Sequence, residues 1–105
     1  MARIPSLARS EDFRSVMRAG RRVRMDGITT YVCPGSTPSS RLGVAVRARN
    51  AVVRNRIKRR IRAAFRSVVG DERRDVVVRA DESSLEVDFQ QLSKILGRAL
   101  RSEAA

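Results

Sequence analysis

The side chains best suited to chemistry in this sequence are cations, and they gather in one segment. Residues 51 to 66 contain six arginines, one lysine and no acid. The wider segment from 27 to 70 contains ten basic residues and again no acid. Arginine contacts phosphate through a flat, bidentate fork and can also stack on bases. These residues therefore predict binding to a phosphate polymer.

The groups that a protein would need for its own catalysis are scarce. Histidine is absent and Cys33 is the single cysteine, so the usual neutral-pH acid–base group, an internal disulfide and a cysteine-rich zinc site are excluded. Neighbouring side chains diverge on a helix and alternate on a strand, which does not suit two-metal phosphodiester cleavage. The acids come as such neighbours: Glu11 with Asp12, Asp71 with Glu72, and Asp81 with Glu82. We expect no catalytic and no metal-binding residue.

Length and charge set the general class of the protein. A chain of 105 residues, 1–105, forms one small domain with a modest core. The formal charge of +12 indicates a polyanionic partner. No stretch approaches the roughly 18 apolar residues of a membrane span, and the N-terminus lacks the apolar region of a secretory signal. We expect a cytoplasmic protein that does not bind membranes and is monomeric in isolation.

A long amphipathic helix must carry the central cations. Asn50 can cap it, and Gly70 can end it in the left-handed conformation. One face is apolar, with Val53, Ile57, Ile61, Ala64, Phe65 and Val68, and the opposite face carries Asn55, Arg56, Lys58, Arg59, Arg60, Arg62 and Arg66. Like charges repel at these spacings, so stability alone does not explain this face. The packing face favours nucleic acid over an anionic membrane, but charge does not separate DNA from RNA.

The remaining segments predict an α+β fold in the order α-β-β-β-α-β-α. A helix over 11 to 18 is capped by Ser10 and stopped by Gly20, and strands over 22 to 33 turn at the Asp-Gly pair 26–27. Further strands follow at 41 to 47 and, in a central position, at 75 to 80. A last helix begins at Asp88, where Gln91 completes a capping box. Its predicted buried side chains are Phe89, Leu92, Ile95, Leu96, Ala99 and Leu100.

The central segment of the sequence resembles a known family. Residues 41 to 66 closely resemble the signature of the bacterial ribonuclease P protein component, whose Arg-Asn-Arg motif corresponds to Arg54, Asn55 and Arg56. Residues 10 to 20 are similar to the N-terminal helix of that family, and residues 75 to 80 to its last strand. The three-letter motif alone is weak, and its strand-loop-helix context makes the resemblance specific.

The resemblance implies a small α/β sandwich with a four-stranded sheet and a left-handed crossover around the basic helix, against the usual rule. It also implies two partners, the catalytic RNA subunit of ribonuclease P and precursor tRNA. The protein would assist removal of the 5′ leader from precursor tRNA. The chemistry would belong to the RNA, which would hold the Mg²⁺ ions, and the protein alone would bind no cofactor.

The resemblance also implies two groups of binding residues. The RNA subunit would contact Arg54, Asn55, Arg56, Lys58, Arg59 and Arg62, to which the cationic face adds Arg60 and Arg66. The single-stranded leader would lie in a cleft formed by Phe13, Met17, Tyr31, Arg47 and Arg49, where stacking and backbone cations tolerate varied sequences.

Plainer interpretations stand beside these roles. Phe13 and Tyr31 suit a core or sheet position as well as a stacking platform, while Phe65, Phe89 and Cys33 are expected in the core. The chain also departs from the family, because only Arg47, Ala48 and Arg49 separate Val46 from Asn50, about two residues fewer than usual. Met17 replaces a common aromatic residue. A ribosome-associated protein or RNA chaperone is the alternative function, followed by a double-stranded DNA binder.

Overall fold

Four strands form one mixed sheet in the order β1-β2-β4-β3. The computed structural model describes residues 4–7, 9–35 and 37–102. Its elements are α1 (Ser10–Ala19), β1 (Arg21–Met25), β2 (Ile28–Pro34), β3 (Arg41–Arg47), α2 (Ala51–Val68), β4 (Arg74–Asp81), the short 3-10 helix η1 (Glu82–Glu86) and α3 (Phe89–Ser102). The predicted order of helices and strands is confirmed, and η1 is an addition that the sequence patterns did not predict.

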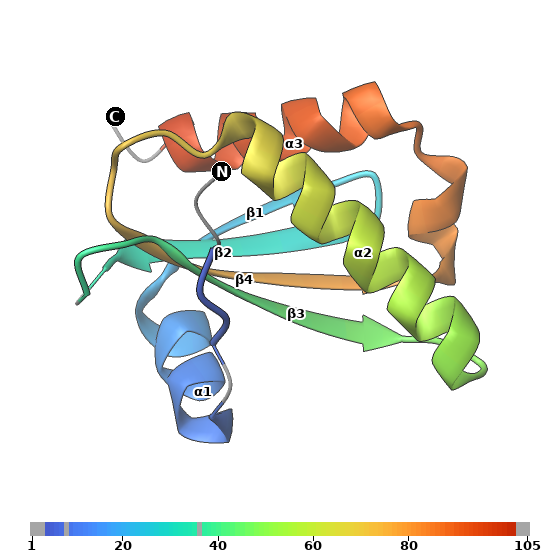
Figure 1. Ribbon diagram of the computed structural model, residues 1–105, viewed down its shortest axis with the longest axis horizontal. Helices are drawn as coiled ribbons and strands as arrows, with labels where there is room; N and C mark the ends of the chain where they lie inside the picture. Colours follow the sequence, from blue (N-terminus) through green and yellow to red (C-terminus); the bar gives the residue numbers. More distant parts are fainter. Residues whose placement is uncertain (1–3, 8, 36, 103–105) are drawn as a thin grey trace.

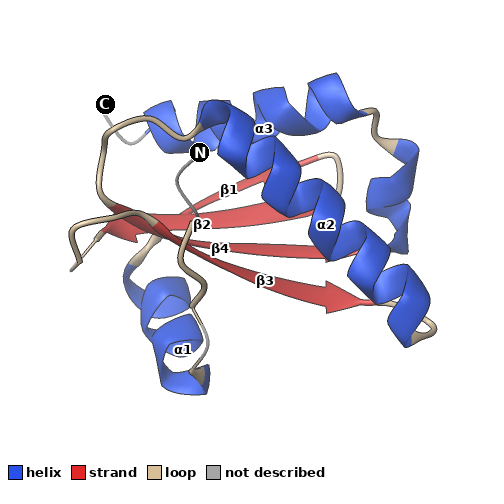
Figure 2. Ribbon diagram, viewed as in Figure 1, coloured by secondary structure: helices blue, strands red, loops and turns tan. Residues whose placement is uncertain are grey.

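The helices cover the two faces of the sheet unequally (Figures 1 and 2). α2 and α3 lie across one face, whereas α1 lies against one end of the other face. The main core fills the space under α2 and α3, and α2 contributes Ile57, Ile61 and Phe65 to it. Each such fully buried side chain stabilises the fold by about 1.5–3 kcal/mol. A smaller cluster around Val16 and Tyr31 lies under α1. No helix of the described part of the chain covers the rest of that sheet face.

The connection around α2 has the uncommon hand. β3 and β4 are parallel neighbours, and α2 joins them. In Figure 1, β3 lies in front of β4 and α2 lies above both, so the path from β3 through α2 to β4 is left-handed. β4 also pairs with β2, antiparallel, which confirms its predicted central position. The α+β fold that the resemblance implied is confirmed.

The predicted signals at the helix ends hold in part. Asn50 caps α2, because its side-chain oxygen accepts a hydrogen bond from the Val53 N–H at 2.9 Å. The prediction for Gly70 is wrong, since α2 ends at Val68 and the chain leaves through the extended Val69 (φ −69°, ψ 133°) without needing a left-handed residue. The prediction for Ser10 is also wrong. Ser10 is the first residue of α1, and the preceding Arg9 makes no side-chain capping bond.

The hairpin between β1 and β2 turns at the predicted residues. Asp26 (φ 52°) and Gly27 (φ 77°) both have positive φ, which is the type I′ geometry that matches the twist of the strands. The Gln91 side chain donates to the Asp26 carboxylate at 3.1 Å, so the predicted capping box is half formed. Asp88 accepts from the Gln91 N–H at 2.8 Å, but the Gln91 side chain points to the hairpin instead.

α3 buries most of the predicted stripe but not its first member. Leu92, Ile95, Leu96, Ala99 and Leu100 are buried. The Phe89 side chain is 43% exposed, so its predicted place in the core is wrong. Together with Arg59, Ala63 and Arg66 it lines a hollow on the polar flank of α2.

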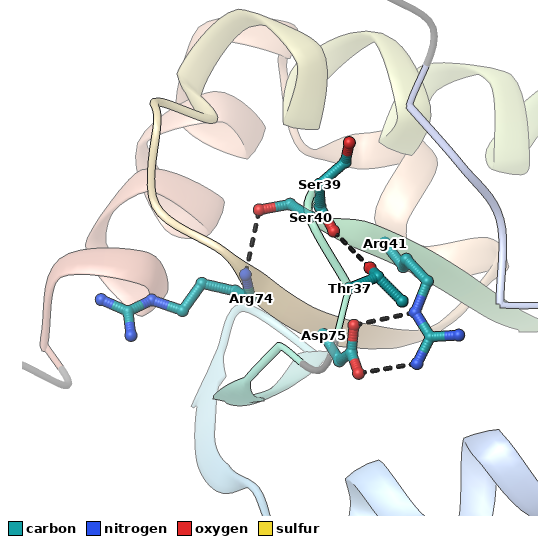
Figure 3. A network of polar contacts seen from close by, with 6 residues as sticks. All are labelled: Thr37, Ser39, Ser40, Arg41, Arg74 and Asp75. Carbon is teal, nitrogen blue, oxygen red and sulfur yellow. Dashed lines mark hydrogen bonds and ion pairs between the residues drawn. The ribbon is translucent and has the colours of Figure 1, made fainter.

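Polar contacts fix the ends of β3 and β4 to each other (Figure 3). Arg41 donates to both carboxylate oxygens of the buried Asp75, at 3.0 and 2.8 Å. This hydrogen bonding raises the pKa of the Arg41 guanidinium. The Ser40 hydroxyl accepts from the Arg74 N–H at 3.0 Å and donates to the Glu72 carbonyl at 2.6 Å. The loop before β3 is thereby joined to the segment that enters β4.

Candidate nucleic-acid interface

The cations of α2 lie on the part of the helix that the core leaves uncovered. The buried residues of this helix are Ile57, Ile61, Ala64 and Phe65, as the periodicity predicted. The exposed or half-buried side chains are Arg54, Asn55, Arg56, Lys58, Arg59, Arg60, Arg62 and Arg66. Across residues 4–7, 9–35 and 37–102, no carboxylate lies within 4.0 Å of an α2 cation. We call these seven cations and Asn55 the α2 face.

The N-terminal turn of α2 intensifies the positive field. No acid lies in this first turn, where the partial positive charge of the helix end would favour one. Arg54 lies at the end of this turn and Arg56 in the next one, close to the free amide groups. The field of the helix end and the side-chain charges therefore have the same sign, which suits an anion supplied from outside the chain.

Arg60 differs from the rest of the α2 face because it has a structural task. Its guanidinium donates to the Ser84 carbonyl at 2.9 Å and to the Val87 carbonyl at 2.6 Å. These bonds attach the segment from η1 to the start of α3 to the side of α2. Two of its five N–H donors satisfy protein carbonyls, while its charge still contributes to the α2 face.

A second cationic surface lies on the opposite side of the sheet. Residues that pair directly across strands share a face, and the register places Arg24 beside Thr29, Thr29 beside Arg79, and Arg79 beside Ala45. A groove of about 450 Å³ opens over this row. Its lining includes Arg22, Arg24, Thr29, Tyr31, Ala45, Arg47, Arg79 and Asp81. We call it the sheet groove.

One acid lies at the edge of the sheet groove. The hydroxyl and the amide of Ser83 both donate to the Asp81 carboxylate, and with a smaller contribution from Arg47 they lower the pKa of Asp81. Asp81 therefore stays ionised at neutral pH and offsets part of the charge of Arg47. Four arginines and one acid leave the groove positive, so it also suits an anionic polymer.

The predicted aromatic platform lies where α1 meets the groove. Tyr31 is 8% exposed and packs with Val16 and Val77, yet it is also one of the residues that line the groove. Phe13 and Met17 are half-buried against the same cluster. Tyr31 is thus chiefly a core residue, and its exposed part is all that a ligand can contact. Cys33 is half-buried in this cluster too, so its full burial is not confirmed.

Of the two arginines predicted beside the leader, only Arg47 lines the sheet groove. Arg49 lies past the end of β3, where its backbone N–H donates to Glu82 at 2.6 Å and its guanidinium lies 3.6 Å from the same carboxylate. The guanidinium is largely exposed, and an ion pair of this kind is worth about 0–1 kcal/mol. The short connection from Arg47 to Asn50 therefore turns Arg49 toward η1.

Three arginines of the sheet groove were not predicted from the sequence as binding residues. The 26–27 turn and the alternation of β1 pair Arg22 with Tyr31 and Arg24 with Thr29, on the groove side of the sheet. The position of these two arginines could therefore have been predicted from the sequence. Arg79 lies in a strand that the sequence suggested was covered on both sides. It is exposed because α1 covers only the other end of that face.

No three acidic, histidine or cysteine side chains among residues 4–7, 9–35 and 37–102 form a group suited to hold a metal ion. Within the same ranges, no helix combines the length and the apolar character of a membrane span.

Comparisons with known proteins agree with this geometry. The family model described as Ribonuclease P matches residues 1–103. The ribonuclease P protein component of Acidothermus cellulolyticus is 39% identical over 108 residues, which cover 92% of this chain and 89% of the relative. The solved RNase P protein of Staphylococcus aureus has a TM-score of 0.76 at 26% identity, covering 96% of both chains. That of Thermotoga maritima has a TM-score of 0.72 at 27% identity, covering 89% of this chain and 96% of its own.

Proposed function

The chain belongs to the ribonuclease P protein family, and on this premise we propose that it assists the RNA-catalysed removal of 5′ leaders from precursor tRNA. In this proposal the catalytic RNA subunit binds the α2 face, and the single-stranded leader lies in the sheet groove. The observation that carries the proposal is the α2 face itself, whose cations have no carboxylate partner within the described part of the chain.

The proposal explains why repulsion is tolerated on α2. Like charges three and four residues apart destabilise a free helix by a few tenths of a kcal/mol per pair. RNA phosphates would remove this repulsion on binding and release their own counterions, which drives association. Burial of Ile57, Ile61 and Phe65 keeps the helix folded until then.

The two surfaces adjoin at one end of β3. Arg47 lines the sheet groove, and α2 begins only four residues later at Ala51. Figure 1 shows the end of β3 leading into the start of α2. Arg54 and Arg56 lie in the first two turns of this helix. A leader in the groove would therefore pass close to the RNA bound by this end of the helix. Binding both together would favour precursor over mature tRNA.

The division of chemistry follows from the available side chains. The described residues contain no group of three metal ligands, so in this proposal Mg²⁺ and the cleavage step belong to the RNA subunit. Mg²⁺ there would supply the activated water and stabilise the leaving oxygen. The residues of this chain bind and position, because their cations screen phosphate repulsion and hold the leader extended.

Reconstitution tests the proposal directly. The protein is mixed with the ribonuclease P RNA subunit of the same organism and a 5′-labelled precursor tRNA at a magnesium concentration too low for the RNA alone. We expect a single leader fragment that ends at the mature 5′ end. The same reaction with an Arg56→Ala, Lys58→Ala, Arg59→Ala variant should need more protein. Binding of RNA without any leader product would instead favour an RNA chaperone or a ribosome-associated protein.

A further inference from the structure

Phe89 is an aromatic side chain that the fold does not bury. It is 43% exposed, and Val52 is the one other large hydrophobic residue that is exposed within the described residues. An exposed phenylalanine forgoes the stabilisation that the fold would gain if its ring were buried in the core. Neither the sheet groove nor the cations of the α2 face account for this position.

Phe89 borders a hollow that is otherwise framed by α2. The hollow has a volume of about 440 Å³, within the range of about 300–1,000 Å³ for ligand pockets. Arg59, Arg62 and Arg66 stand around it, and Ala63 supplies a short side chain that leaves the space open. No acidic residue lines it. An aromatic ring thus faces an opening bordered by cations.

The ring is held on a fixed support. Asp88 accepts hydrogen bonds from the Gln91 N–H at 2.8 Å through its side chain and from the Leu92 N–H at 2.9 Å through its carbonyl. Arg60 binds the Ser84 and Val87 carbonyls just before it. Arg60 therefore fixes the chain to α2 just before Phe89, and the Asp88 bonds fix the first turn of α3 just after it, so little ordering is needed when a ligand arrives.

We propose that Phe89 is a stacking platform for an unpaired base of the RNA that binds the α2 face. This inference rests on the proposed function and adds a second kind of contact to it. Bases stack on aromatic rings while arginines hold the flanking phosphates, a combination that selects single-stranded or bulged nucleotides over a continuous helix. The exposed lining of the hollow is mainly apolar, which suits the flat face of a base, and the arginines that border it favour RNA over an apolar peptide.

Affinity measurements on Phe89 variants separate stacking from charge. Phe89→Ala should weaken binding of the ribonuclease P RNA subunit by about tenfold. Its plot of log affinity against log salt should keep the wild-type slope, since no phosphate contact is removed. Phe89→Leu retains apolar volume without a π face and should also weaken binding, whereas Phe89→Tyr should bind as the wild type does. Gln90→Ala, which shortens an exposed side chain next to Phe89 that does not line the hollow, is the matched control and should change nothing.

A spectroscopic experiment tests the contact itself. The chain contains no tryptophan, so Phe89→Trp introduces a single indole. Stacking by a base should quench its fluorescence when the RNA subunit is added, at the same concentration that gives binding by filter retention. Binding without quenching would overturn the inference. A Phe89→Ala variant that binds the RNA subunit with wild-type affinity would also overturn the inference. In that case the proposed function would still stand if the α2 variants lost affinity. Failure of the wild-type protein to yield a leader product is a separate result, which rejects the proposed function.

Discussion

The ring of Phe13 lies directly against the backbone of Gly43, so closely that a Cβ atom at position 43 would come within 2.7 Å of its Cζ atom. This contact holds α1 against the sheet beside Tyr31. Glycine is therefore required at 43 by close approach and not by an unusual backbone angle.

Gly43→Ala should displace α1 and destabilise the protein. Overpacking of this kind costs about 1–3 kcal/mol. Urea unfolding followed by circular dichroism should show the loss as a lower midpoint with an unchanged slope. Phe13→Leu in the same chain removes the clashing ring and should restore part of the stability. A double variant no more stable than Gly43→Ala alone would contradict the proposed contact.

Arg79→Ala should selectively weaken substrates that carry a leader. Arg79 lies on a central strand and lines the sheet groove, and no carboxylate of residues 4–7, 9–35 and 37–102 lies within 4.0 Å of it, so its removal takes charge from the groove without opening the core. The KM for precursor tRNA should rise several-fold, while inhibition by mature tRNA stays the same. Arg73→Ala removes one exposed charge outside the groove lining and is the control. Equal losses for both RNAs would reject the groove as the leader site. Tyr31→Ala should show the same selectivity, but it also removes core packing.

Ser83→Ala should raise the pKa of Asp81 toward its ordinary value of 3.8. The Ser83 hydroxyl and amide hold the folded-state pKa below the unfolded value, so the carboxylate stabilises the fold above about pH 3.8. This contribution is lost as the pH falls through the lower, folded-state pKa. Carbon-detected NMR titration of the carboxyl group measures both values. An identical pKa in the two proteins would mean that the Ser83 hydroxyl bond is not formed in solution.

Local signals in the sequence predicted much of the fold, because they act within one or two turns of chain. The apolar period of α2, the Asn50 cap and the Asp26–Gly27 turn each require only near neighbours. The left-handed crossover came from the family resemblance alone, since no pattern of residue types specifies the hand of a connection.

The predictions that were wrong or incomplete concern residues whose neighbours in the fold lie far away in the sequence. Gly70 was expected to be left-handed, but the path from α2 to β4 leaves through an extended Val69. Phe89 has the spacing of a core residue, and the attachment of α3 to α2 through Arg60 places it over the polar flank instead. Arg79 became part of the groove because α1 is too short to cover the whole sheet face.

The salt dependence of RNA binding tests the central claim that the α2 face neutralises RNA phosphates. In the Arg56→Ala, Lys58→Ala, Arg59→Ala variant, affinity for the RNA subunit should fall, and the slope of log affinity against log salt should shrink by about two units. The matched control removes three exposed cations from α3, Lys94, Arg98 and Arg101, with the same change in net charge. A reduced slope for the α2 variant and a wild-type slope for the α3 variant is the predicted result. A wild-type slope for the α2 variant, or equal reductions in both, would contradict the assignment of this helix face to RNA.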